Sequence, residues 1–458
     1  MLDFQSIAAI IFLIILTFFV YWKRKNLDTK QIMPHILYFS MYKTTWGIRL
    51  MDSVAYKSRK VIIIIGYLGI LVGFLGMVLI SYGLVNNIFV LFTKPEASPG
   101  VGLVLPVKAK GIFYVPFFYW IISIFVIAVV HEFSHGLVAR ANNLKVKSSG
   151  FAFVGSGFRS AGIVIILSSF YLKVISHNSI FDPTKFNFLD VSSPDFWLVI
   201  GIIFIIVSYI KTTFSLIGYI PIIPAAFVEP DEKALRKRPH KEQLSVFAAG
   251  PFSNIAVALL CALVLYFVLS PIANAIIEPN GVKIVDYIKS NQTFPAESAG
   301  IKIGEIIHQA DKSPTPFLEN LSKIIMGKKP GELISIQTDK STYYLKLAKN
   351  PDNESHAYLG AYLEQSTKIN EHARKSYGEF LPSSFVWLIG LFFILYVLNL
   401  GIGLFNLVPI GPLDGGRMLQ VVSQRIFGKE RGDKVWGYIG MFFLILILVN
   451  IVFGFVRA

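Results

Sequence analysis

The chain has 458 residues, of which 54% are hydrophobic and only 16% are charged. A soluble protein of this length needs more charge to cover its surface, so the composition excludes an ordinary soluble enzyme and indicates a membrane protein. The formal net charge of +15 does not indicate nucleic-acid binding, because the basic residues lie in loops between apolar segments and no groove-reading motif accompanies them. The single cysteine, Cys261, excludes a Cys-rich zinc cluster, so any metal ion would need His and carboxylate ligands.

Six apolar segments are long enough to cross a bilayer, which takes about 20 residues of helix. We predict membrane helices at Phe4–Trp22, Val61–Val85, Phe113–Ala139, Phe247–Leu269, Ser384–Leu407 and Val435–Val456. Two shorter segments, Ile163–Ile175 and Phe196–Ile210, are candidates for two more spans, and the first is short enough to be re-entrant. The sequence therefore predicts a polytopic α-helical membrane protein with six to eight transmembrane helices.

The distribution of lysine and arginine predicts how these helices are oriented. Lys23–Lys60 carries nine basic residues against two acidic ones, so we expect it in the cytoplasm. Alternating from there, the basic loops Arg140–Lys147, Lys211–Lys241 and Arg417–Lys434 also fall inside. We therefore expect an integral protein of a prokaryotic cell membrane with both its N- and C-termini outside.

Two segments outside the spans have β-type patterns. Ser98–Pro116 contains two short β-prone runs separated by Lys108, Ala109 and Lys110, which predicts a small membrane-associated β-hairpin. Gly281–Leu347 is polar and of mixed charge, with strand-like and helix-like stretches. It is large enough to form a small α+β module, which the predicted topology places outside the cytoplasm.

The motif His131-Glu132-Phe133-Ser134-His135 lies near the end of an apolar helix. At helical spacing i and i+4 the two imidazoles share one face and can bind a single zinc ion. Glu132 is rotated off that face, so it is better placed to hold a water molecule beside the metal than to be a ligand. Zinc lowers the pKa of such a water to about 7, and a neighbouring carboxylate can take its proton. Chance is a poor explanation, because burying these groups in an apolar helix is costly unless they serve a site.

A third protein ligand is expected in Asn406–Arg417, where an apolar helix breaks into a Pro/Gly-rich stretch with a lone carboxylate, Asp414. Taken alone, an Asp before Gly415 is typical of a turn cap. However, this stretch and the histidine motif both fall at the predicted cytoplasmic ends of spans, and irregular backbone at membrane depth is tolerated only where protein buries it or it lines a cavity. The matched depth favours Asp414 as a ligand, in an active site that faces the cytoplasm.

Together, HEFSHG and NLVPIGPLDGGR resemble the site-2 protease family of intramembrane zinc metalloproteases. Gly250–Asn254 is similar to the family's Gly-Pro-x-x-Asn element, and Pro295–Ile307 resembles a PDZ-type module of the sort inserted between its core helices. The resemblance covers Gly100–Arg417. It implies one Zn²⁺ per chain.

Carried over position by position, the resemblance implies that His131, His135 and Asp414 bind the zinc ion and that Glu132 is the general base. It implies further that Asn254 and Asn406 bind substrate.

The activity implied is cleavage of transmembrane segments of substrate proteins, as in regulated intramembrane proteolysis, with membrane proteins and the lipid bilayer as partners. A substrate helix must unwind before its amide bonds can be attacked, and the edge of the predicted hairpin could pair with the unwound stretch. The chain departs from the family pattern in an insertion, residues 151–225, that holds the two shorter spans and whose role the resemblance does not indicate.

Two other classes of function are possible for a membrane protein with buried His and Asp residues. A transporter or metal-handling membrane protein could use His and Asp as a relay, but it would not need Glu132 or a folded external module. An inactive protease-like adaptor is disfavoured because all four key residues are present.

These predictions divide the chain into four parts. Residues 1–98 hold N-terminal transmembrane helices and a cytoplasmic loop, and residues 99–270 hold the protease core with the histidine motif and the inserted helix pair. Residues 279–350 form the PDZ-like domain, and residues 380–458 carry the C-terminal core helices with the Asp ligand motif.

Overall fold

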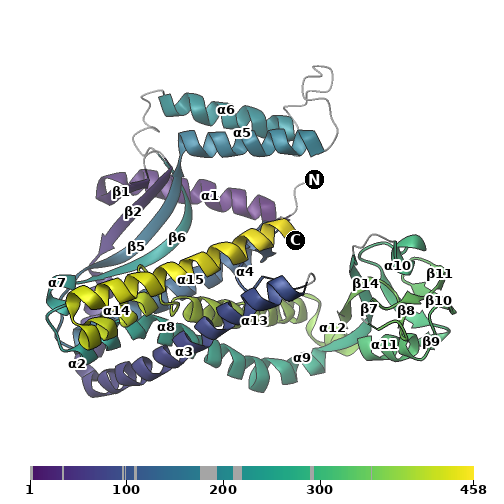
Figure 1. Ribbon diagram of the computed structural model, residues 1–458. Coiled ribbons are helices and arrows are strands. Elements are labelled where there is room, and N and C mark those ends of the chain that lie inside the picture. The colour runs from purple at the N-terminus through teal and green to yellow at the C-terminus, as the bar shows by residue number, and fades with distance from the viewer. Residues whose placement is uncertain are drawn as a thin grey trace. The chain divides into compact units, whose positions relative to one another are not determined.

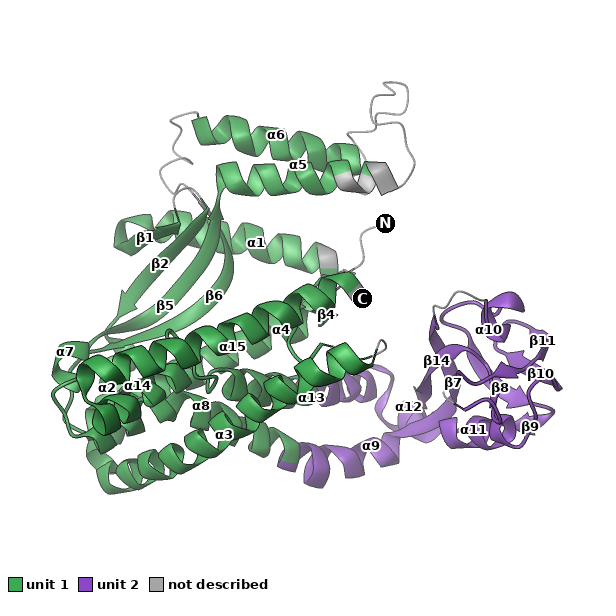
Figure 2. Cartoon of the chain, viewed as in Figure 1, with its two compact units in different colours: residues 1–262, 391–458 green, residues 263–390 purple. Residues whose placement is uncertain are grey.

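A computed structural model describes residues 4–33, 36–94, 97, 99–107, 111–175, 193–209, 219–288, 293–351 and 353–457. The chain divides into two compact units (Figure 2). Unit 1 comprises Met1–Ala262 and Leu391–Ala458, and unit 2 comprises Leu263–Gly390.

Long apolar helices dominate unit 1 (Figure 1). They are α1 (Phe4–Lys23), α3 (Arg59–Thr93), α4 (Phe117–Ala141), α8 (His240–Val264), α13 (Phe380–Phe405) and α15 (Lys429–Arg457). The end of α8 and the start of α13 fall in unit 2. Within the described ranges, six helices are long and apolar enough to cross a membrane, and each overlaps one of the six predicted spans. Large apolar side chains such as Leu71, Leu75 and Val78 point outward from α3 and stay exposed, as lipid contact requires. The prediction of a polytopic helical membrane protein is confirmed.

The two shorter apolar segments form a helix pair, α5 (Phe158–Ile175) and α6 (Pro194–Tyr209), while Ile210 lies outside the described residues. The helices cross at two glycines: a Cβ atom on Gly162 would lie only 2.7 Å from the backbone oxygen of Gly201. The absence of side chains at this crossing lets the two backbones approach closely.

A four-stranded antiparallel sheet in unit 1 was not predicted. Its strands are β1 (Leu27–Met33), β2 (Leu37–Thr44), β5 (Val146–Gly157) and β6 (Tyr219–Pro230), in the order β1-β2-β5-β6. Strands β1 and β2 belong to the loop predicted to be cytoplasmic, Lys23–Lys60, whereas β5 and β6 lie at the two ends of the insertion, residues 151–225. β6 is an edge strand, and it packs against α4.

The predicted hairpin at Ser98–Pro116 is wrong in its topology. Two strands form there, β3 (Leu103–Leu105) and β4 (Ile112–Tyr114), but they pair in parallel. Parallel pairing requires a connection long enough to bring the chain back to the start of the first strand. Six residues separate β3 and β4, and this length suffices because each strand has only three residues. Ser98 and the expected turn at 108–110 lie outside the described residues.

Four short helices complete the described part of unit 1: the 3-10 helix Arg24–Asn26, α2 (Trp46–Lys57), α7 (Glu232–Leu235) and α14 (Asp414–Phe427). α2 packs on α4, and Arg140 near the end of α4 forms an ion pair with Asp52 of α2. These contacts hold the C-terminal end of α4 in place.

Unit 2 is an α+β module that lies between the spanning helices in sequence. In chain order its elements are the π-helix Leu265–Leu269, α9 (Ser270–Ile276), β7 (Ile277–Tyr287), α10 (Pro295–Ser298), β8 (Ile306–Ala310), β9 (Ser313–Pro314), α11 (Leu318–Met326), β10 (Leu333–Thr338), β11 (Thr342–Lys346), β12 (Ala348–Lys349), β13 (Ala357–Tyr358), β14 (Ala361–Ile369) and α12 (Glu371–Tyr377). The main sheet has the order β11-β10-β8-β7-β14, with β9 paired to β8. Because β14 pairs with β7, the sheet extends to Ile369, beyond the predicted end at residue 350.

Candidate metal centre

The histidine motif occupies the C-terminal half of α4, where His131 and His135 lie one turn apart on the same face. The helix ends just beyond them, where the backbone N–H groups of Asn142 and Leu144 both donate to the carbonyl of Ala139. The two imidazoles are therefore carried by a rigid helix and not by a loop.

Asp414 is the first residue of α14, directly after the turn that ends α13. The turn folds back on itself: the Gly415 N–H donates to the Asn406 carbonyl at 2.8 Å. A Cβ atom on Gly415 would lie 2.1 Å from the Leu407 oxygen, and one on Gly416 would lie 2.0 Å from the Ile410 oxygen. Only glycine fits at these two positions, so the Gly-Gly pair permits the close approach that directs Asp414 inward.

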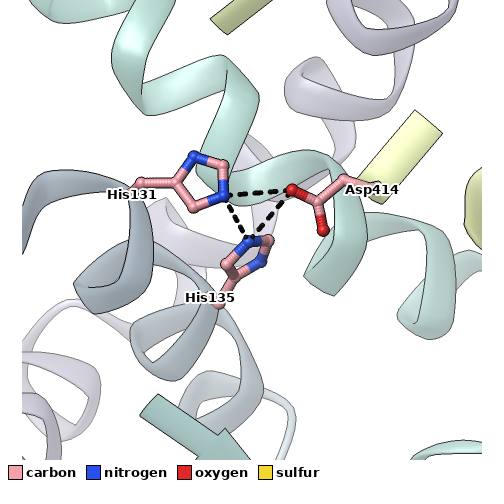
Figure 3. Close-up of side chains that lie close together, drawn as sticks. All are labelled: His131, His135 and Asp414. Atoms are coloured by element: carbon pink, nitrogen blue, oxygen red, sulfur yellow. Dashed lines mark hydrogen bonds and ion pairs between the residues drawn. The ribbon is translucent and has the colours of Figure 1, made fainter. Parts of the chain in front are cut away.

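The three predicted ligands meet at one point (Figure 3). His131 Nε2 lies 3.1 Å from Asp414 Oδ2, and His135 Nε2 lies 3.3 Å from the same oxygen. The two Nε2 atoms are 3.1 Å apart. Ligands at the usual zinc distances in a tetrahedral arrangement are separated by about 3.3 Å, so these spacings fit a zinc ion.

A second observation supports a metal site. Gly250 of α8 faces both histidines, and a Cβ atom there would lie 2.4 Å from His135 Nε2 and 2.6 Å from His131 Nε2. Any other residue at this position would therefore occupy the space beside the two ligand atoms. In the sequence, Gly250 belongs to the element that resembles Gly-Pro-x-x-Asn, but the motif alone indicates no role for it at the metal.

The Nδ1 atom of each imidazole, opposite the Nε2 atom, also contacts a neighbouring polar group. His135 Nδ1 lies 2.6 Å from the carbonyl oxygen of Val246, which can only accept, so Nδ1 carries the proton and Nε2 is free to bind a metal ion. His131 Nδ1 lies 3.1 Å from the side-chain amide of Asn254, a residue with no exposed surface. The two rings therefore have fixed orientations before any ion binds.

The Asp414 carboxyl lies beside both histidines. Burial raises its pKa, but the charge and hydrogen bonds of His135 and His131 outweigh burial and hold that pKa well below its usual range. Asp414 is therefore a carboxylate at neutral pH, the form that can bind a metal ion.

Glu132 does not join this cluster. Its Oε2 accepts a hydrogen bond at 3.1 Å from the backbone N–H of Val228, on the edge strand β6. The role of Val228 cannot be predicted from the sequence, because a backbone donor leaves no signature in side-chain chemistry.

A cavity of about 590 Å³ opens onto the three ligands and Glu132. Asn406 lines it, as does the end of β6 from Val228 to Pro230, whereas the buried Asn254 is not among the lining residues. The cavity also carries charged side chains, Lys147, Glu229, Glu232, Lys233 and Arg417. It is large enough for several residues of an extended peptide.

A family model described as peptidase family M50 matches residues 190–447, more than half of the chain. The chain belongs to peptidase family M50. This confirms the resemblance to site-2 proteases, and it makes the protein a membrane metalloprotease of a zinc-dependent family. The matched segment contains Asn254, Asn406 and Asp414, while the histidines of α4 precede it. Comparison with curated proteins found no match.

Proposed function

We propose that this M50 peptidase is an intramembrane zinc endopeptidase that cleaves transmembrane segments of membrane proteins, with one zinc ion held by His131, His135 and Asp414. The observation that carries the proposal is the convergence of these three side chains, next to Glu132, inside a bundle of membrane-spanning helices. When bound, the ion supplies a Lewis acid that acidifies water and polarises a carbonyl oxygen.

Glu132 is the general base in this proposal. It takes a proton from the attacking water and later delivers it to the leaving amine nitrogen. The Val228 N–H holds the carboxylate through one oxygen, Oε2, so the other oxygen is available to the water. This backbone donor therefore positions the base.

Asn406 and Asn254 have different proposed roles. Asn406 lines the cavity and is placed to donate its side-chain amide to substrate, including the oxyanion that forms during attack. Asn254 is fully buried behind His131 and its side-chain amide lies 3.1 Å from Nδ1, so we assign it a role in orienting that ring.

The substrate is expected to dock on β6 rather than on the Ser98–Pro116 segment. In an extended strand, alternate residues direct their backbone groups to the same side. The Val228 N–H points away from β5, and Ala226 and Pro224 share that outward parity. Proline is tolerated where no partner strand needs its N–H, which agrees with a free edge at Pro224. An unwound substrate stretch can add to this edge where it meets the cavity.

The remaining roles concern topology. We propose that unit 2 is an extracytoplasmic PDZ-like module that filters access to the core. We place both termini outside and the metal centre toward the cytoplasm of a prokaryotic cell, because the basic loops predict this orientation.

The decisive test is Glu132→Gln in purified protein with a transmembrane substrate. We expect cleavage to be abolished while metal analysis still finds about one zinc per chain. Glu229→Gln is the matched control, since Glu229 lines the same cavity but its carboxylate accepts from the Ser148 hydroxyl. Glu229→Gln should keep at least half of the wild-type rate. Turnover by Glu132→Gln would refute the assignment of the base.

A further inference from the structure

Helix α2 packs one face against the rest of unit 1 and leaves the opposite face uncovered. Met51 and Ala55 are buried on the inner face, beside the partly buried Ile48 and Val54. The exposed side chains follow helical spacing along the other face, and they are Trp46, Arg49, Leu50, Ser53, Tyr56 and Lys57. The proposed protease chemistry uses none of these six residues.

The uncovered face of α2 combines aromatic rings with cations. Trp46 is 73% exposed and Tyr56 is 89% exposed. Arg49 and Lys57 lie on the same face, and no ion-pair partner is found for either among the residues that the structure describes. The only acidic residue of α2, Asp52, is paired with a side chain of α4. Aromatic rings and cations without carboxylates are typical of a helix that lies at the surface of a membrane.

The position of α2 in the chain places it at the level of a membrane surface. A single residue, Ser58, separates α2 from the spanning helix α3, whose apolar run begins at Val61. Val61 and Ile64 are exposed, so the lipid-facing surface of α3 begins within one turn of the end of α2. The exposed Lys60 adds a further cation at this junction. The uncovered face is therefore continuous along the chain with a surface that contacts lipid.

The inner face of α2 contacts the helix that carries the histidine motif. A Cβ atom on Gly136 of α4 would lie 2.6 Å from Met51 Sδ and 2.8 Å from Val228 Cγ1. The bare backbone at Gly136 therefore lets α2 and β6 pack against the same point of α4. One turn further on, Arg140 of α4 forms the ion pair with Asp52. Both contacts lie in the half of α4 that carries the two histidines.

The first turn of α2 also contacts the sheet of unit 1. A Cβ atom on Gly47 would lie 2.9 Å from the hydroxyl oxygen of Ser149 on β5. Ser149 is paired with Val228 of β6, whose N–H donates to Glu132. The position of α2 therefore acts on both partners of that hydrogen bond, through α4 on one side and through the sheet on the other.

We propose that the uncovered face of α2 binds the anionic headgroups of phospholipids, and that this contact holds α2 where it keeps Glu132 and Val228 together. The inference rests on the proposed function, because it assigns regulation to the same base. Anionic headgroups complement the two cations of the face, while its aromatic rings suit the boundary between headgroups and acyl chains. Anionic lipid in the surrounding membrane therefore raises the cleavage rate.

The binding test uses the full chain in nanodiscs and does not depend on proteolysis. Acrylamide quenching of tryptophan fluorescence is measured as phosphatidylglycerol replaces phosphatidylcholine stepwise, and the difference between the wild type and Trp46→Phe isolates Trp46. We expect quenching of Trp46 to fall at least twofold as the anionic lipid increases, because headgroups shield the ring. Arg49→Gln with Lys57→Gln should lose most of this shielding, since each cation near an anionic surface strengthens binding roughly fivefold.

Lys237→Gln with Lys241→Gln is the matched control for the loss of two positive charges. Both lysines are exposed and belong to a basic loop predicted on the same side of the membrane, but neither lies in α2 or lines the cavity at the metal ligands. This control should leave the shielding of Trp46 unchanged within experimental error. Quenching that does not depend on lipid charge, or an equal loss of shielding in the control, would overturn the proposal.

The cleavage rate tests the coupling between α2 and the base. In the wild type, phosphatidylglycerol should raise the rate at least threefold over phosphatidylcholine alone. Asp52→Asn removes the ion pair with Arg140 but leaves the uncovered face intact, so Trp46 should stay shielded while most of the stimulation is lost. A wild-type rate that ignores lipid charge, or full stimulation of Asp52→Asn, would overturn the coupling. Shielding of Trp46 without cleavage in any lipid would refute the protease function and support the lipid contact.

Discussion

Units 1 and 2 both bury apolar side chains, but they differ in the side chains that they expose. Unit 2 encloses an apolar core in which Ile284, Ile307 and Leu321 have no exposed surface. Unit 1 has apolar contacts of its own, but it also buries Asn254 and Asn399 completely, while large apolar side chains stay exposed on its spanning helices.

The difference reflects the two environments, water and the hydrocarbon of the lipid bilayer. The part of unit 2 between its two membrane-type helices, residues 277–377, is built like a water-soluble domain, whereas the exposed surface of the spanning helices suits hydrocarbon. A buried polar group in unit 1 gains from a partner within the protein: the Asn399 side-chain N–H donates to the Leu395 carbonyl at 2.8 Å, while its Oδ1 has no hydrogen-bond partner among the described residues. The metal centre is an extreme case of the same rule, because its polar groups are tolerated where they satisfy one another. We therefore expect substitutions in the two units to have different consequences.

The largest expected effect is at the metal. Asp414→Ala removes an ionised ligand from a buried site, so bound zinc should fall well below one per chain and cleavage below about 1% of the wild-type rate. Metal analysis and a cleavage assay measure both. Asp414→Glu should keep part of the zinc with little activity. Full zinc occupancy in Asp414→Ala would place the third ligand elsewhere.

A matched pair of leucines tests the difference in solvent directly. Leu75 on α3 is 57% exposed and Leu333 on β10 is 58% exposed. Leu75→Asp should destabilise membrane insertion by about 3 kcal/mol, because a carboxylate would face lipid. Leu333→Asp should change the stability of unit 2 by less than about 0.5 kcal/mol. An insertion assay for α3 and unfolding of the full chain in nanodiscs give the two values, and equal costs would contradict the comparison.

A smaller effect is expected at the edge of β6. Val228→Pro removes the N–H that holds Glu132 and also replaces a side chain that packs beside Gly136, at a position with the same outward parity as Pro224. The rate should fall about tenfold, equivalent to about 1.4 kcal/mol, with zinc content unchanged. Ala226→Pro is the control, since it alters the same edge without touching the base. A wild-type rate in Val228→Pro would show that the hydrogen bond does not position Glu132.

The smallest effect is expected from removing the sheet of unit 2. Pro279 and Thr367 are paired across β7 and β14, so a two-residue Asn-Gly turn can replace residues 280–366 and close the ladder. Cleavage of a short model transmembrane segment should stay within twofold of wild type or rise, because none of the proposed site residues lies in the replaced segment. Loss of activity in a variant that retains its zinc would mean that unit 2 helps to build the site.

Sequence by itself determined the spanning helices and the two candidate histidine ligands, because both depend on local pattern. Apolar runs of membrane length predict helices wherever they occur, and the spacing of His131 and His135 fixes a shared helical face. Asp414 needed the additional argument of matched depth, and the structure places its carboxylate against both imidazoles.

Only the tertiary structure decided the surroundings of the site. β5 and β6 pair far apart in the sequence, Ser149 opposite Val228, and neither strand alternates between polar and apolar residues in a way that predicts it. The Val228 donor to Glu132 follows from that pairing, and the need for glycine at position 250 follows from the contact of α8 with the histidines of α4. Both are backbone properties of long-range packing, which side-chain patterns along the chain do not encode.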